Sequence, residues 1–97
     1  MIYLDSDTPI KWHDMRDSIS GNLVTDATVT GALLDMDGNT LGTFEFAYLA
    51  PDYVGIIPAS LASTLSENCE YQIEITANHG GSVMVRKQVE TASWGGF

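Results

Sequence analysis

Cysteine is nearly absent from this chain of 97 residues, in which Cys69 is the only one. A single cysteine cannot close an internal disulfide, so the fold must be stable without one, as in a reducing cytosol. Basic residues are also scarce, with four Lys and Arg against thirteen Asp and Glu and a formal net charge of −9. A charge of this sign repels phosphate backbones and anionic lipid surfaces, so we expect binding to neither nucleic acid nor membranes.

Long apolar runs are missing as well. No window approaches the roughly 18 apolar residues of a transmembrane helix. The first residues, MIYLDSDTPIKWHD, lack the basic start and apolar stretch of a secretory signal peptide. We therefore expect a protein made in the cytoplasm, and the length predicts a single domain with one modest core.

Helical periodicity is confined to residues 58–68, PASLASTLSEN, which could form one or two short turns or a loop. Elsewhere the pattern is typical of strands, because apolar and polar residues alternate between turn signals about 8 to 12 residues apart. The sequence predicts an all-β fold with six or seven strands, within residues 9–15, 26–34, 41–50, 52–58, 69–77 and 82–90.

The last two of these segments carry the clearest alternation. Residues 69–77 place Cys69, Tyr71, Ile73 and Ile75 on one face, which predicts that Cys69 is a small buried hydrophobic residue. Residues 82–90 place Val83, Val85 and Val89 on one face, which we expect to point inward. Lys87 interrupts this face, and an inward charge is typical of an edge strand.

The segment LLDMDGNT, residues 33–40, has two interpretations: a calcium loop or the turn of a β-hairpin. Counted from Asp35, an EF-hand loop would need glycine at its sixth position and glutamate at its twelfth, where this chain has Thr40 and Phe46. Asp37 and Gly38 instead form the dipeptide favoured in hairpin turns, because glycine tolerates positive φ. The sequence predicts a turn and no metal site.

Catalytic and metal-binding patterns are absent from the sequence. His13 and His79 have no second His or Cys at ligand spacing, so a zinc site is not expected. No nucleophile elbow, phosphate loop or dinucleotide-binding glycine motif occurs, and the carboxylates are scattered through turns and outward strand positions. We expect no cofactor and no enzymatic activity.

Aromatic residues are the remaining candidates for binding. Trp12, Tyr48, Tyr53 and Trp94 could form a platform for a sugar, or could divide between the core and a protein interface. We interpret these four residues, together with Phe97, as partner-binding. Tyr71 has a structural interpretation, because a tyrosine that opens a strand after a crossover can pin that crossover through its hydroxyl group.

Two stretches carry a resemblance. GNLVTDATVTGALLDMDGN contains Gly21, Leu23-Val24, Asp26-Ala27-x-Val29, a strand and an Asp-Gly turn; YVGIIPASLASTLSENCEYQIEITA contains an aromatic-x-Gly strand, a proline, a Leu-rich crossover and Tyr-x-Ile-x-Ile. Together they resemble bacterial and phage immunoglobulin-like domains. The resemblance implies an antiparallel Greek-key β-sandwich of about seven strands over residues 10–90, which leaves residues 1–9 as an N-terminal arm and 91–97 as a C-terminal tail.

As a single copy, the chain is similar to the small free-standing immunoglobulin-like proteins of tailed-phage structural gene modules. The resemblance implies a virion component, such as a capsid decoration or head-tail completion protein, that binds multiple capsid or neck subunits through its loops and arms. Trp94 and Phe97 would anchor the C-terminal arm, and deleting residues 91–97 would leave the fold intact and weaken assembly. The alternatives are a carbohydrate- or surface-binding module and a cytoplasmic accessory protein that binds a host protein.

Overall fold

A computed structural model describes residues 1–17 and 19–94. It confirms the all-β prediction. In chain order the elements are β1 (Ile2–Tyr3), β2 (Thr8–His13), β3 (Thr28–Leu34), β4 (Thr40–Leu49), β5 (Asp52–Ile57), α1 (Ala59–Ala62), β6 (Glu70–His79) and β7 (Ser82–Ser93). Among these residues, no helix is long and apolar enough to cross a membrane.

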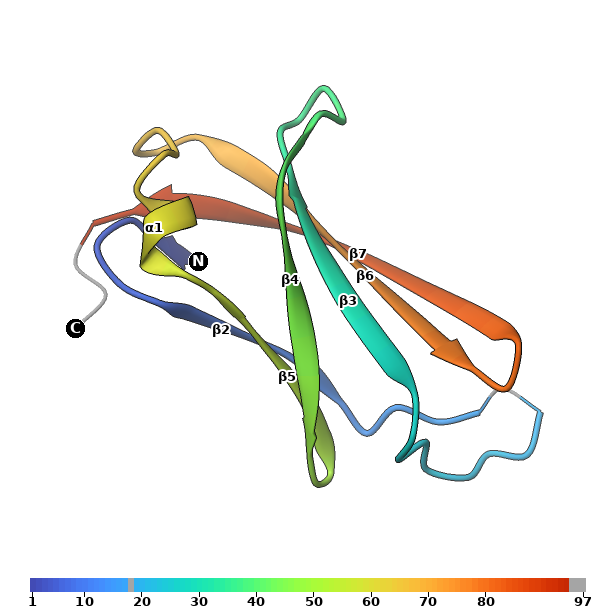
Figure 1. Cartoon of the computed structure of the whole chain (residues 1–97). Coiled ribbons are helices and arrows are strands. Elements are labelled where there is room, and N and C mark those ends of the chain that lie inside the picture. Colours follow the sequence, from blue (N-terminus) through green and yellow to red (C-terminus); the bar gives the residue numbers. More distant parts are fainter. Residues whose placement is uncertain (18, 95–97) are drawn as a thin grey trace.

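The seven strands form one mixed sheet in the order β1-β7-β6-β3-β4-β5-β2, and this sheet curls nearly into a barrel (Figure 1). Strand β4 makes the bend, because its residues 40–45 pair with β3 and its residues 46–49 pair with β5. The neighbouring strands are antiparallel except for β1, which pairs in parallel with the end of β7. Two connections, residues 14–27 and 58–69, cross from the β2–β5 side to the β3–β6–β7 side.

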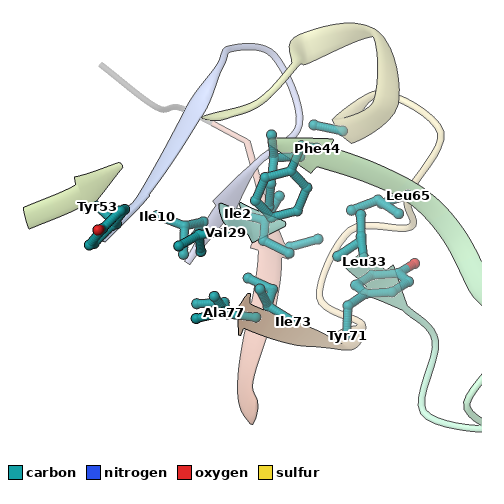
Figure 2. Packing of buried hydrophobic residues seen from close by; sticks show 14 of the residues in the cluster. Ile2, Ile10, Val29, Leu33, Phe44, Tyr53, Leu65, Tyr71, Ile73 and Ala77 are labelled. Carbon is teal, nitrogen blue, oxygen red and sulfur yellow. The ribbon is translucent and has the colours of Figure 1, made fainter. Parts of the chain in front are cut away.

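The core lies inside the curl of the sheet, where side chains from both sides meet (Figure 2). The alternation predicted for β6 is confirmed at Tyr71, Ile73 and Ile75, which are all buried. Gly31 of β3 also faces the core, where it pairs with Phe44. A Cβ atom at Gly31 would lie 2.5 Å from Cζ of Phe44, so the missing side chain makes room for the aromatic ring.

The two ends of the chain differ from the expected arms. Ile2 and Leu4 are buried, and Ile2 pairs with Ala92, so residues 1–9 contribute to the sheet and to the core. Strand β7 continues to Ser93, three residues beyond the predicted end of the sandwich at residue 90, and Ala92 has no exposed surface. The physical reason is mutual burial, since each end covers apolar surface that the other would leave in water.

Two buried tyrosines fix the crossings between the two sides of the sheet. The Tyr71 hydroxyl accepts a hydrogen bond from the Ser66 N–H at 2.8 Å, in the 58–69 connection. The Tyr53 hydroxyl accepts one from the Ala27 N–H at 3.0 Å, at the end of the other connection. In each case a phenol oxygen partners a backbone N–H that no strand neighbour reaches, which removes the cost of an unpaired donor.

Replacing Tyr71 with Phe should lower the free energy of unfolding by about 1 kcal/mol, because the Ser66 N–H loses its acceptor while the ring stays in place. Urea unfolding followed by tryptophan fluorescence measures the loss. Tyr48→Phe is the matched control, since the Tyr48 hydroxyl makes no hydrogen bond to the described residues. Equal midpoints for Tyr71→Phe and wild type would contradict this role of the hydroxyl.

Candidate interaction surface

Three of the aromatic residues interpreted as partner-binding lie side by side in the sheet. Trp12 of β2 pairs with Tyr53 of β5, and Tyr53 pairs with Tyr48 of β4. The Tyr48 and Tyr53 ring centroids are 5.0 Å apart. The row faces inward: Trp12 and Tyr48 are half-buried, and Tyr53 keeps only 2% of its surface exposed. The partner-binding role predicted for Tyr53 is therefore corrected, because its side chain belongs to the core.

The other two predicted partner-binding residues lie elsewhere. Trp94 follows the end of β7 and exposes 56% of its surface, so it is available for contact. Phe97 lies outside the described residues. The five residues therefore do not form a single platform in the described structure.

The outward valines of β7 form an apolar surface that sequence reasoning missed. Val83, Val85 and Val89 expose 59%, 54% and 50% of their surfaces, so the prediction that they point inward is wrong. Paired residues of adjacent strands share a face, and in β7 it is Met84, Arg86 and Gln88 that pair with the core residues of β6. We call Val83, Val85 and Val89 the valine stripe.

A second group of outward apolar residues lies on β5 and its two neighbours. Ile56 is half-exposed and pairs with the exposed Pro9 of β2. Leu49, at the end of β4, exposes 62% of its surface. Val54, half-buried, lies between the exposed Lys11 and Ala47, with which it pairs on the two sides of β5. The molecule thus carries outward apolar side chains on both sides of its curled sheet.

Positive charge is concentrated on β7. Arg86 and Lys87 supply two of the four basic residues of the chain. Lys87 Nζ lies 3.6 Å from a carboxylate oxygen of Glu74 on β6. Arg86 is exposed and has no ion pair with any residue that the structure describes. Strand β7 therefore carries an unpaired cation on the face opposite the valine stripe, in an otherwise acidic protein.

The histidines contact carboxylates. His13 Nδ1 lies 2.5 Å from Asp52 Oδ1 across the β2–β5 pair. His79 lies between two aspartates of the 14–27 connection, with Nε2 3.0 Å from Asp26 Oδ1 and Nδ1 3.7 Å from Asp17 Oδ2. Within residues 1–17 and 19–94, no group of three or more His, Cys, Asp or Glu side chains is arranged to hold a metal ion.

Cys69 is exposed, so its predicted burial is wrong. Strand β6 begins one residue later, at Glu70, and the preceding Asn68 has a φ of 63°. The turn at Asn68 directs Cys69 away from the face that Tyr71 shares with the core. The backbone of Cys69 is nevertheless fixed, because its carbonyl accepts a hydrogen bond from the Ala92 N–H at 2.9 Å. No pocket opens among the described residues.

The Asp-Gly segment forms the turn of the β3–β4 hairpin. Gly38 has a φ of +92°, a conformation that side chains with a Cβ atom rarely adopt. Asp35 organises this turn: its Oδ1 accepts hydrogen bonds from the backbone N–H groups of Asp37 and Asn39 at 3.0 and 2.9 Å, and its Oδ2 accepts one from the Asn39 side chain at 3.0 Å. An aspartate before a turn is a recognisable signal for this arrangement.

These hydrogen bonds lower the pKa of Asp35 below its ordinary value of 3.8, chiefly through the Asn39 side-chain amide and then the Asn39 backbone. Because the pKa is lower in the folded state, the carboxylate stabilises the fold above pH 3.8, and this contribution is lost as the pH falls through the folded-state pKa. Asp35→Asn should therefore reduce the loss of stability on acidification below pH 3.8.

Thermal unfolding between neutral and acidic pH measures that difference, and NMR titration of the Asp35 carboxyl locates its pKa directly. Asp37→Asn is the control, since the Asp37 side chain accepts no hydrogen bond from the described part of the chain. A pKa for Asp35 at or above 3.8 would show that the turn does not stabilise the ionised form.

Comparison of the chain with protein-family models, with curated proteins and with solved structures gave no match.

Proposed function

We propose that this protein is a non-enzymatic structural protein that binds neighbouring protein subunits, and that its setting is the virion of a tailed phage, as a capsid decoration or head-tail completion component. The valine stripe is the observation that carries the proposal, because three of the four outward residues between Ser82 and Glu90 are valines that each expose half or more of their surface. A cluster of exposed apolar side chains of this kind is typical of a protein–protein contact.

We propose further that the fold is an immunoglobulin-like Greek-key sandwich. The strand order supports it, with β1 parallel to β7, and β7, β6 and β3 adjacent on one side of the bend in β4. The two crossing connections and the Tyr71 hydroxyl bound to Ser66 N–H support it as well. A scaffold of this type presents loops and strand faces around a rigid core, so it offers several contact surfaces at once.

The binding surface in this proposal differs from the one expected from the aromatic residues. Tyr53 is buried, and the N-terminal residues pair with β7, so neither provides a free contact. The exposed valines, together with Trp94, take their place. Repeated copies on a symmetric shell would gain avidity from many weak contacts of this kind.

Co-assembly tests the proposal. The chain is produced together with the products of its neighbouring genes, and assembled particles are sedimented through a density gradient. We expect the protein in the particle fractions at a fixed ratio to one major subunit, and a lower ratio for Val85→Lys, which places a charge in the valine stripe. Val54→Thr, on the other side of the sheet, is the control. A protein that stays at the top of the gradient refutes the virion role.

Glycan titration distinguishes the carbohydrate-binding alternative from the proposed protein contact. The Trp12, Tyr53 and Tyr48 row faces the core, so a sugar platform there would require the sheet to open. Saturable quenching of tryptophan fluorescence by a glycan, lost in a Trp94 variant, would favour that alternative over a protein contact.

A further inference from the structure

Strand β7 is paired along only part of one edge. On one side, β6 pairs with β7 from Ser82 to Thr91. On the other side, β1 covers only Ala92 and Ser93. The edge from Ser82 to Thr91 therefore has no neighbouring strand among the residues that the structure describes. We call this stretch the free edge of β7.

The direction of the backbone groups on this edge follows from the hydrogen bonds at its end. The Ala92 N–H donates to the Cys69 carbonyl at 2.9 Å, so Ala92 is turned toward the β6 side. The Ser93 carbonyl accepts a hydrogen bond from the Leu4 N–H at 2.8 Å, so Ser93 is turned toward the β1 side. Because the direction alternates along a strand, the residues whose N–H and C=O groups point to the free edge are Val83, Val85, Lys87, Val89 and Thr91.

The same residues supply the side chains beside the edge. The valine stripe covers the outward face next to the free backbone groups, with Lys87 between Val85 and Val89. Proteins commonly protect an exposed edge with charges, a proline or a bulge. Here Lys87 is the only outward charge between Ser82 and Glu90, and Lys87 already lies next to Glu74. An added strand would gain hydrogen bonds and apolar contact together.

The charge of the edge indicates what such a strand carries. Arg86, near the middle of the free edge, is exposed and has no ion pair in the described structure. A carboxylate directly across from it would form a favourable cross-strand pair. We propose that the free edge of β7 binds an extended strand of a partner protein, with apolar side chains against the valine stripe and a carboxylate opposite Arg86. This inference rests on the proposed function and specifies the contact that it requires.

A second copy of this chain fits the edge less well. In a dimer, a two-fold axis would join two antiparallel β7 strands into one sheet. Outward side chains must then meet outward side chains, so the central residue of the pair lies opposite its own copy. The two registers that use nearly the whole free edge are centred on Arg86 or on Lys87, and each places that residue opposite itself. Like charges directly opposite one another destabilise a strand pair. A register centred on Gln88 would bring Arg86 to Glu90, but Glu90 already contacts the Met1 amine.

A tethered strand tests the edge without knowledge of the natural partner. Strand β1 is parallel to β7 with Ile2 opposite Ala92, so residues added before Met1 would run along β7 toward Ser82. Counting back from that pair, the fifth added residue lies opposite Arg86. The probe is an N-terminal extension that alternates valine and threonine and carries glutamate at this fifth position. A glycine–serine extension of equal length is the control, and tethering raises the effective concentration of the strand into the millimolar range.

The measurement is amide hydrogen exchange at Val83, Val85, Lys87 and Val89. We expect the glutamate extension to slow exchange at these amides by about tenfold or more relative to the glycine–serine extension, because their N–H groups become hydrogen-bonded. Lysine at the fifth position should give less protection, and Arg86→Glu should reverse the order of the two. Exchange that equals the glycine–serine control in every extension would overturn the proposal.

Two further measurements separate the remaining outcomes. Val85→Pro removes an N–H that points to the free edge and leaves the bonds to β6, so it should abolish the protection while the fold persists. Val85→Ala, which keeps the N–H, is its control. Sedimentation of the wild-type chain should show a monomer; a dimer that Val85→Pro abolishes would assign the edge to a second copy instead. The tethered strand could slow amide exchange although the protein is absent from the sedimented particles. That result would support strand binding at the free edge and refute the virion role.

Discussion

Deleting residues 91–97 is expected to lower the free energy of unfolding by roughly 3 to 5 kcal/mol, because three backbone hydrogen bonds of about 1 kcal/mol each are lost along with burial of Ile2. The bonds join Ala92 N–H to Cys69 C=O, Asn68 N–H to Ala92 C=O and Leu4 N–H to Ser93 C=O. The resemblance to immunoglobulin-like domains implied instead that this deletion would leave the fold intact.

Chemical unfolding of the wild-type protein and of the 91–97 deletion, monitored by circular dichroism, measures the difference in the free energy of unfolding. Deletion of 94–97 is the matched control: it removes the exposed Trp94 and retains Ala92 and Ser93. We expect the shorter deletion to change stability by no more than about 0.5 kcal/mol. Equal unfolding midpoints for the two deletions would show that the end of β7 does not hold β1 in place.

Tyr53→Ala should cost about 3 to 5 kcal/mol, the range for truncating a large buried aromatic side chain. Tyr53 is among the most deeply buried large residues of the core, and its hydroxyl satisfies the Ala27 N–H. A residue that acted only at a partner surface would lose binding and keep its stability. The measured quantity is the free energy of unfolding from a urea titration.

Two variants control for the Tyr53 prediction. Tyr53→Phe keeps the ring and removes the hydroxyl, so it should lose only about 1 kcal/mol. Leu49→Ala truncates an exposed neighbour at the end of β4 and should stay within about 0.5 kcal/mol of wild type. An unchanged urea midpoint for Tyr53→Ala would contradict the assignment of Tyr53 to the core.

Local patterns predicted much of the sheet. The alternation around Ile73 and Ile75 located β6 and its buried face, Pro58 marked the end of β5, and the Asp-Gly dipeptide coincides with the turn between β3 and β4. These features depend on contacts within a few residues, so they are written directly in the order of the side chains. Strand β1 escaped prediction because a pair of residues is too short to show a period.

The site was harder to predict than the sheet. In β7 the odd-numbered residues are the more apolar set, and hydrophobicity alone placed them inside. The register against β6 reverses this choice, because Gln88 and Arg86 pair with Ile73 and Ile75 and must share their face. A shift of one residue in the pairing register moves every side chain of a strand to the opposite face of the sheet. The valine stripe therefore depended on a pairing that no local signal specifies.

By itself the sequence determined the class of fold, the positions of most strands and turns, and the acidic charge, because each of these is set by local side-chain order or by composition. The tertiary structure alone decided that both chain ends are built into the sheet, that Tyr53 is buried, that Cys69 is exposed and that β7 presents its valines to solvent. All of these depend on contacts between residues far apart in the chain, such as Ile2 with Ala92. Whether a side chain is buried depends on which strands pair and pack next to it, and these neighbours are set by the tertiary structure.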